Sequence, residues 1–123
     1  MNSETFIKTI APLLKAHGFK KSNATWRRLQ AESIAVLNVT KSPWGSGDYY
    51  INLGTYFLAL GSLTNPTENK CHVQMRLALA EPVVALDNAL SWFAARERLS
   101  DASRLADSDS KKGLFFKEVR IST

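Results

Sequence analysis

The chain has 123 residues, of which 45% are hydrophobic and 22% charged, and its net charge is +5 at pH 7. This length fits one domain, and the composition is too apolar for a disordered protein. The single cysteine excludes an internal disulfide, and no apolar run approaches the ~20 residues that a membrane-spanning helix needs.

A first helix is predicted for residues 1–18. Apolar residues recur there at the three- and four-residue spacing of one buried helical stripe: Phe6, Ile7, Ile10, Leu13 and Leu14. Ser3 is a candidate N-cap, and Gly18 supplies the left-handed residue at which helices commonly end. Pro12 removes an amide donor inside the stripe, which predicts a kink within one helix.

Residues 24–77 are predicted to form an antiparallel sheet of about four to five strands. The segment 33–41 is rich in branched side chains and apolar on both faces, as an interior strand is. The segment 49–59 resumes as an aromatic strand after a dense turn signal, so the two segments are predicted to form a hairpin. Gly54 indicates a bulge or a close backbone approach. The other strand patterns lie at 24–30 and 72–77.

Residues 82–107 are predicted to form helices, the last of them capped by Ser100 and Asp101. A polar linker and a C-terminal strand or extended arm are predicted for 108–123. Strands gathered in the middle, with helices at both ends, predict a single α+β domain over 1–123. We expect the N-terminal helix and the C-terminal helices to pack on the sheet.

The sequence contains no evident catalytic or metal-binding set. Cys71 and His72 are neighbours on a predicted strand, where adjacent side chains point to opposite faces and do not converge on one site. Tetrahedral zinc needs three or four nitrogen or sulfur ligands, and the two histidines and one cysteine of the chain lack ligand spacing. We therefore expect a protein that is not an enzyme and that binds no metal or cofactor.

Basic residues outnumber acidic residues in the N-terminal part of the chain. Five of them form a candidate binding cluster: Lys20, Lys21, Arg27, Arg28 and Lys41. Such a cluster can attract phosphate backbones, anionic lipid or an acidic protein. Lysines at a strand edge also protect against aggregation without binding any partner, so the pattern alone does not decide between these roles.

Two further features are candidates for binding. Trp44 lies in the hairpin loop beside Pro and Gly, where it is either a recognition anchor or a lid on the core. Polar residues of the predicted strands converge on one sheet face if the register allows it: Asn38, Asn52, Gln74 and Arg76. Because buried amides need partners, such a polar floor is either an internal network or a small-molecule site.

Four segments, taken in order, carry a family resemblance. They are a Gly-Phe turn at 17–21, an aromatic-basic strand at 25–28, a Lys-Ser-Pro-Trp-Gly hairpin within 38–45 and an Ile-Asn-Leu-Gly strand within 49–54. Over about residues 6–58, and more weakly to about residue 93, the chain resembles a bacterial family known as domain of unknown function 4304. The resemblance implies a small α+β domain with no established activity, cofactor or catalytic residues. Some bacterial families of this kind neutralise secreted toxins, although similarity of fold does not fix function.

These observations leave three functional hypotheses. The first is a non-enzymatic module that binds a protein partner, as an immunity-type protein binds its toxin. The second is a nucleic-acid-binding domain that uses the basic cluster, and the third is a small-molecule site on the polar floor. Residues 1–5 lack the basic flank and apolar stretch of a secretory signal, so a cytoplasmic protein without membrane association is expected. The sequence does not indicate an oligomeric state.

Overall fold

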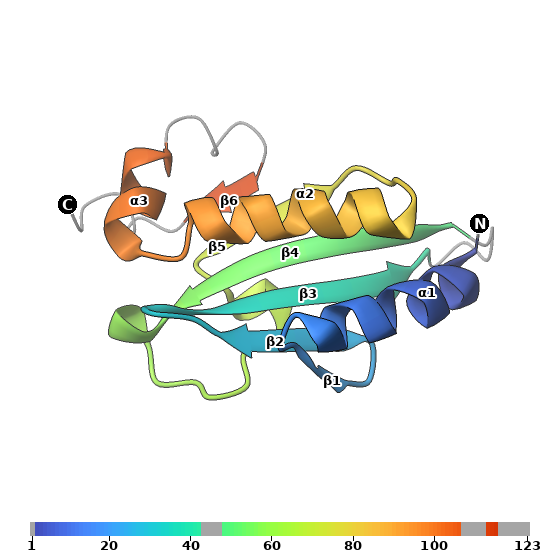
Figure 1. The fold of residues 1–123 in the computed structure, drawn as a ribbon. Coiled ribbons are helices and arrows are strands. Elements are labelled where there is room, and N and C mark those ends of the chain that lie inside the picture. The colour runs from blue at the N-terminus through green and yellow to red at the C-terminus, as the bar shows by residue number, and fades with distance from the viewer. Residues whose placement is uncertain (1, 43–47, 107–112, 116–123) are drawn as a thin grey trace.

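The computed structural model describes residues 2–42, 48–106 and 113–115, the last three by their backbone (Figure 1). Six strands form one antiparallel sheet in the order β1-β2-β3-β4-β5-β6, so each strand pairs with its neighbours in sequence. The elements in chain order are α1 (Ser3–Ala16), β1 (Lys20–Ser22), β2 (Thr25–Leu29), β3 (Ser33–Lys41), β4 (Tyr49–Phe57), the short 3-10 helices η1 (Leu58–Leu60) and η2 (Glu68–Lys70), β5 (Val73–Leu77), α2 (Pro82–Ala95), α3 (Leu99–Arg104) and β6 (Gly113–Phe115).

The predicted α+β architecture is confirmed. The hairpin of 33–41 with 49–59 exists as β3 and β4, which pair from Ser33 opposite Phe57 to Lys41 opposite Tyr49. Strands β1 to β5 form the sheet, and the short β6 extends it beside β5. The remaining residues of the predicted linker and C-terminal strand lie outside the described residues.

Three local predictions need correction. Strand β1 was not predicted, because its three residues are all exposed and show no apolar alternation. The N-cap of α1 is Asn2 rather than Ser3, since the Asn2 side chain accepts a hydrogen bond from the amide of Thr5 at 2.9 Å. Helix α3 begins at Leu99, before the predicted caps Ser100 and Asp101.

Helices α1 and α2 pack on the same face of the sheet (Figure 1). The apolar stripe of α1 buries Phe6, Ile10 and Leu14 completely, and α1 ends where Gly18 takes a positive φ of 85°. The inner strands of the sheet contribute a row of fully buried side chains to the main core, and α2 contributes Phe93. Each such side chain stabilises the fold by about 1.5–3 kcal/mol relative to exposure.

A second, smaller apolar cluster lies on the opposite face of the sheet. Ile34, Val36 and Tyr56 alternate along their strands with residues of the main core, so they point away from the helices. Cys71 packs against them from the segment between η2 and β5. Gly54 makes this possible: a Cβ at Gly54 would lie 2.6 Å from the sulfur of Cys71. The close approach predicted at Gly54 is confirmed, and Gly54 keeps its place in the ladder between Val36 and Gln74.

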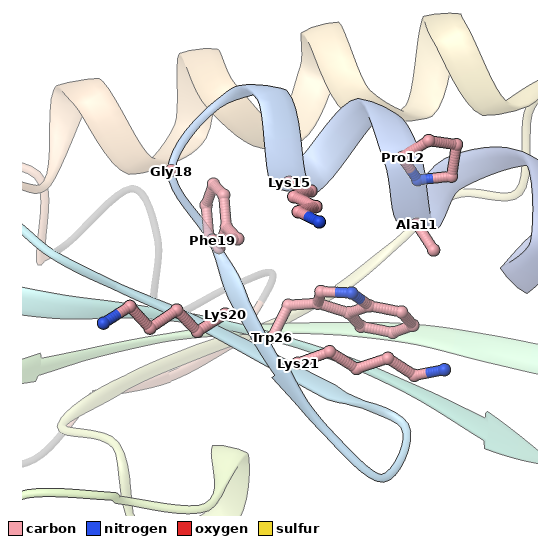
Figure 2. Close-up of a pocket in the computed structure, with 8 residues that line it drawn as sticks. All are labelled: Ala11, Pro12, Lys15, Gly18, Phe19, Lys20, Lys21 and Trp26. Atoms are coloured by element: carbon pink, nitrogen blue, oxygen red, sulfur yellow. The ribbon is translucent and has the colours of Figure 1, made fainter.

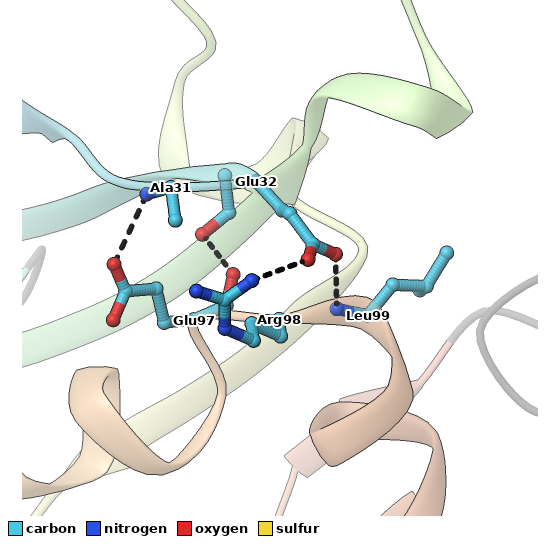
Figure 3. Close-up of polar contacts among 6 residues, drawn as sticks. Ala31, Glu32, Glu97, Arg98 and Leu99 are labelled. Carbon is cyan, nitrogen blue, oxygen red and sulfur yellow. Dashed lines mark hydrogen bonds and ion pairs between the residues drawn. The ribbon is translucent and has the colours of Figure 1, made fainter.

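The turn between β2 and β3 is bound to the junction of α2 and α3 (Figure 3). The amide of Ala31 donates to the Glu97 carboxylate at 3.0 Å. The Glu32 carboxylate accepts from the Arg98 guanidinium at 2.9 Å and from the amide of Leu99 at 3.2 Å. Because the first amides of a helix lack partners within it, Glu32 supplies to α3 the acceptor that a local cap would provide.

We expect Ser33→Ala to lower the free energy of unfolding by about 1–3 kcal/mol, since it leaves buried polar groups without a partner. Ser33 is fully buried, and its hydroxyl donates to the carbonyl of Glu97 at 2.8 Å and accepts from Gln30 at 3.0 Å. Denaturant titration measures the loss. Ser100→Ala, at an exposed position of α3, is the control and should change stability little. An equal effect of both substitutions would contradict the assigned role.

We expect Thr55→Val to raise the free energy of unfolding by about 1 kcal/mol, because valine has the same shape and removes an unsatisfied hydroxyl. Thr55 is fully buried in β4, and its Oγ1 has no hydrogen-bond partner among the described residues. The control is Thr40→Val, since the Thr40 hydroxyl donates to Asn38 at 2.5 Å. Thermal and denaturant unfolding should show that Thr55→Val is more stable than the parent protein and that Thr40→Val is equally stable or less stable.

Candidate binding surface

Four of the five predicted basic residues lie together. Lys20 and Lys21 on β1 and Arg27 and Arg28 on β2 line one groove of about 700 Å³. A tight turn places the two strands side by side, with Asn23 in the left-handed region at φ 58° and Lys20 opposite Arg27. The fifth residue, Lys41, is separate and lines a shallow hollow beside the first turns of α1.

The same groove contains exposed leucines that were not predicted as site residues. Leu29, Leu58 and Leu63 are 72%, 43% and 47% exposed, and they are three of the six large hydrophobic side chains that are exposed in the described residues. The one signal in the sequence was Leu63, a lone apolar residue within a polar loop. Leucines exposed singly are ordinary, but three of them beside four cations form an amphipathic surface.

The segment 58–66, which forms one wall of this groove, is held in place by hydrogen bonds. The hydroxyl of Tyr56 accepts from the amide of Leu63 at 3.1 Å. The guanidinium Nε of Arg27 donates to the carbonyl of Pro66 at 2.8 Å. The amide of Leu58 donates to the carbonyl of Glu32 at 3.1 Å. Leu58 and Leu63 are therefore presented by ordered backbone, which lowers the entropy cost of binding through them.

A second cavity, of about 600 Å³, lies on the other side of β1, between that strand and α1. Its apolar lining comes from Ala11, Pro12, Phe19 and Trp26, and Figure 2 shows the Trp26 ring below Ala11 and Pro12. Lysines also line it: Lys15, Lys20 and Lys21. In the described structure, no Asp or Glu is among the residues that line either cavity, so both favour acidic groups.

The polar side chains predicted on one sheet face form a row across three strands. Asn38 lies opposite Asn52, and Asn52 opposite Arg76. The Asn38 amide donates to Thr25 at 3.0 Å, and the Asn52 amide donates to Asn38 Oδ1 at 3.1 Å. The Arg76 guanidinium lies 4.0 Å from the centre of the Tyr50 ring. Because the amides bond to each other and to the neighbouring hydroxyls of Thr25 and Thr40, the row fits an internal network better than a ligand site.

Glu68 lies near this row, and burial raises its carboxyl pKa, an effect that the positive charge of Arg76 partly offsets. The folded state thus holds this proton more tightly than the unfolded chain, so stability should fall as pH rises from the ordinary value of 4.5. Glu68→Gln should therefore stabilise the protein at pH 7, and the gain should disappear in acid. Unfolding curves between pH 3 and 8 measure this, with Asp87→Asn, at an exposed position inside α2, as the control. A gain that is independent of pH would contradict the assignment.

Cys71 and His72 do not form a nucleophile and base. The thiol of Cys71 is buried, and burial raises its pKa, which disfavours the reactive thiolate. The Nδ1 atom of His72 accepts a hydrogen bond from the amide of Phe57 at 3.0 Å. In the part of the chain that the structure describes, no three His, Cys, Asp or Glu side chains are placed to hold a metal ion. Within the same residues, no helix has the length and apolar character required to cross a bilayer.

The remaining site prediction, Trp44, falls outside the described residues. A family model described as a domain of unknown function, DUF4304, matches residues 10–111 of the chain. This match covers both cavities, β1 and the polar row. Comparison with the curated proteins finds no match, and neither does comparison with the solved structures.

Proposed function

The chain belongs to the DUF4304 family, and from its surface we propose that it is a non-enzymatic module that binds an acidic protein partner through the groove beside β1. The observation that carries this proposal is the joint presence of three exposed leucines and four basic side chains in that groove. Burying leucine surface is favourable by about 25 cal/mol per Å² removed from water, and the part of this gain that exceeds the cost of association appears as affinity. The surrounding cations add long-range attraction and select for an acidic partner.

A nucleic-acid partner is the second candidate, because the same four cations could contact phosphates. Proteins that bind single strands usually add exposed aromatic rings on which bases stack. Here the neighbouring rings of Phe19 and Trp26 are buried, and the exposed apolar side chains are leucines. These features favour a protein partner.

An immunity role is the finer form of the proposal. The chain would act in the cytoplasm and neutralise a toxin by covering an acidic surface on it. The support is that some small bacterial families of this kind neutralise toxins, together with the amphipathic groove. Co-expression with the product of a neighbouring gene tests it: that product should be toxic alone and harmless with this chain. Equal toxicity in both cultures counts against an immunity role.

Affinity capture with the full chain tests the protein-binding proposal, followed by titration of the purified captured protein. Leu63→Asp should weaken binding at least tenfold, because it places a like-charged, polar group where an acidic partner buries leucine. Leu79→Asp is the matched control, since Leu79 is 54% exposed but does not line the groove, and it should change affinity less than twofold. Equal losses for both variants, or none, would count against the groove.

Fluorescence anisotropy with labelled single-stranded and duplex oligonucleotides tests the second candidate. If the four cations bind phosphates, affinity should fall steeply between 50 and 200 mM salt, with a slope set by the number of phosphates contacted. Lys20→Glu should then weaken binding to every sequence equally. We expect only weak, non-specific binding that is lost at physiological salt, and tight binding that persists there would overturn the protein-partner assignment.

A further inference from the structure

We propose that the partner binds as an extended acidic strand added to the outer edge of β1, with its side chains entering both cavities alternately. This inference rests on the proposed function and specifies its geometry. The proposed ligand is a segment of a partner protein in which acidic residues alternate with apolar ones.

The first support is the position of β1 at the edge of the sheet. β1 pairs with β2 on one side only, and all three of its residues are exposed. An edge strand directs the N–H and C=O groups of every second residue outward, where an added strand can pair with them. Three residues provide few such hydrogen bonds, so side-chain contacts must supply most of the affinity.

The second support is the placement of the two cavities. Residues of β1 line both: Lys20 and Lys21 border the cavity under α1 and also the leucine groove on the opposite face. Successive side chains of a strand point to opposite faces of the sheet. A strand beside β1 would therefore direct one set of side chains toward Phe19 and Trp26, and the other set toward Leu29 and Leu63.

The third support is charge, which also decides between possible occupants. Lysines line the cavity under α1, and Lys20 and Arg27 line the groove. In the proposed register, the acidic set of side chains enters the cavity under α1 and lies close to its lysines, and the apolar set faces the leucines of the groove. Cross-strand pairs of opposite charge are stabilising. A second copy of this chain pairing through its own β1 would place lysines against lysines, which disfavours a symmetric dimer at this edge.

The test uses a fluorescein-labelled peptide of eight residues in which Glu alternates with Leu and Val, and the full-length protein. We expect saturable binding and at least tenfold slower hydrogen exchange of the β1 amides. Peptides that are N-methylated at one alternate set of positions should lose binding, whereas N-methylation of the other set should be tolerated. This alternation is the signature of strand addition, because only every second amide of an added strand pairs with β1.

Two charge-matched variants on one helix test the placement of the acidic side chains. Lys15→Glu should weaken peptide binding about tenfold because Lys15 lines the cavity under α1. Lys8→Glu makes the same charge change at an exposed position outside both cavities, and it should weaken binding less than twofold. Circular dichroism melts confirm that both variants fold. Equal losses would mean that only net charge matters, which would overturn the proposed register.

The outcomes separate this inference from the proposed function. Peptide binding that perturbs Leu58 and Leu63 without slowing exchange in β1 would overturn strand addition and leave groove binding intact. Equal binding of both sets of N-methylated peptides would likewise overturn strand addition and leave groove binding intact. Absence of peptide binding up to millimolar concentration would also overturn strand addition, while the capture experiment with Leu63→Asp would still decide whether the groove binds a protein.

Discussion

Replacing Trp26 by alanine is expected to lower the free energy of unfolding by about 3–5 kcal/mol, the range for truncating large buried aromatic side chains. Trp26 is 1% exposed and belongs to the main core, where it is among the largest buried side chains. It lies opposite Lys21 on one side and Leu37 on the other, so its ring joins the edge of the sheet to the interior. The space left by alanine would connect with the cavity under α1, and the removed contacts would not be replaced.

Equilibrium unfolding in urea measures this loss, and the same strand provides the control. Leu29→Ala removes a side chain that is 72% exposed, so its effect should stay within about 0.5 kcal/mol. Trp26→Phe keeps an aromatic ring and should recover much of the stability. A loss below about 1 kcal/mol for Trp26→Ala would mean that the core closes around the gap and that this ring does not support the β1 edge.

The sequence predicts those elements whose signals are local. The hairpin of β3 and β4 was predictable because branched and aromatic residues mark each strand and a dense turn separates them. The start of α3 was not, because the acceptor for the amide of Leu99 is Glu32, which is far away in sequence. β1 has no periodicity of its own, and it exists as a strand because Asn23 permits a tight turn onto β2.

The same distinction applies to the candidate site, where the residues that are close in sequence were predictable and the others were not. Lys20, Lys21, Arg27 and Arg28 were predictable as a group, since they are close in sequence and a single turn brings them together. Lys41 does not lie with the other four residues, because β3 extends beyond its pairing with β2 and Lys41 is at its far end. The leucines of the groove come from β2, from η1 and from the loop after η1, so only the folded chain brings them together. The cavity under α1 was likewise invisible, because it depends on how far α1 stands from β1.

Gly54→Ala is expected to destabilise the protein by about 1–3 kcal/mol through overpacking. An added Cβ at Gly54 would lie 2.6 Å from the sulfur and 2.8 Å from the Cβ of Cys71. Both distances are shorter than the non-bonded contacts that Cβ atoms make in proteins. Gly54 and Cys71 are both buried, and the carbonyl of Glu68 lies 3.4 Å away on the same side. The contact can be relieved only if the segment around Cys71 moves away from β4. That movement would disturb the second apolar cluster and the loop that carries Leu63.

A double-mutant cycle with Cys71→Gly isolates this contact, because that substitution removes both the Cβ and the sulfur. Cys71→Gly alone should destabilise the protein by leaving a gap beside Tyr56, yet Gly54→Ala should cost much less in that background. Denaturant unfolding of the four proteins gives the coupling energy, which should be favourable by at least about 1 kcal/mol. Additive losses would show that the two residues do not oppose each other. If the cycle behaves as expected, Gly54→Ala should also weaken binding of the partner, because a shift of the segment around Cys71 would disturb the loop that carries Leu63.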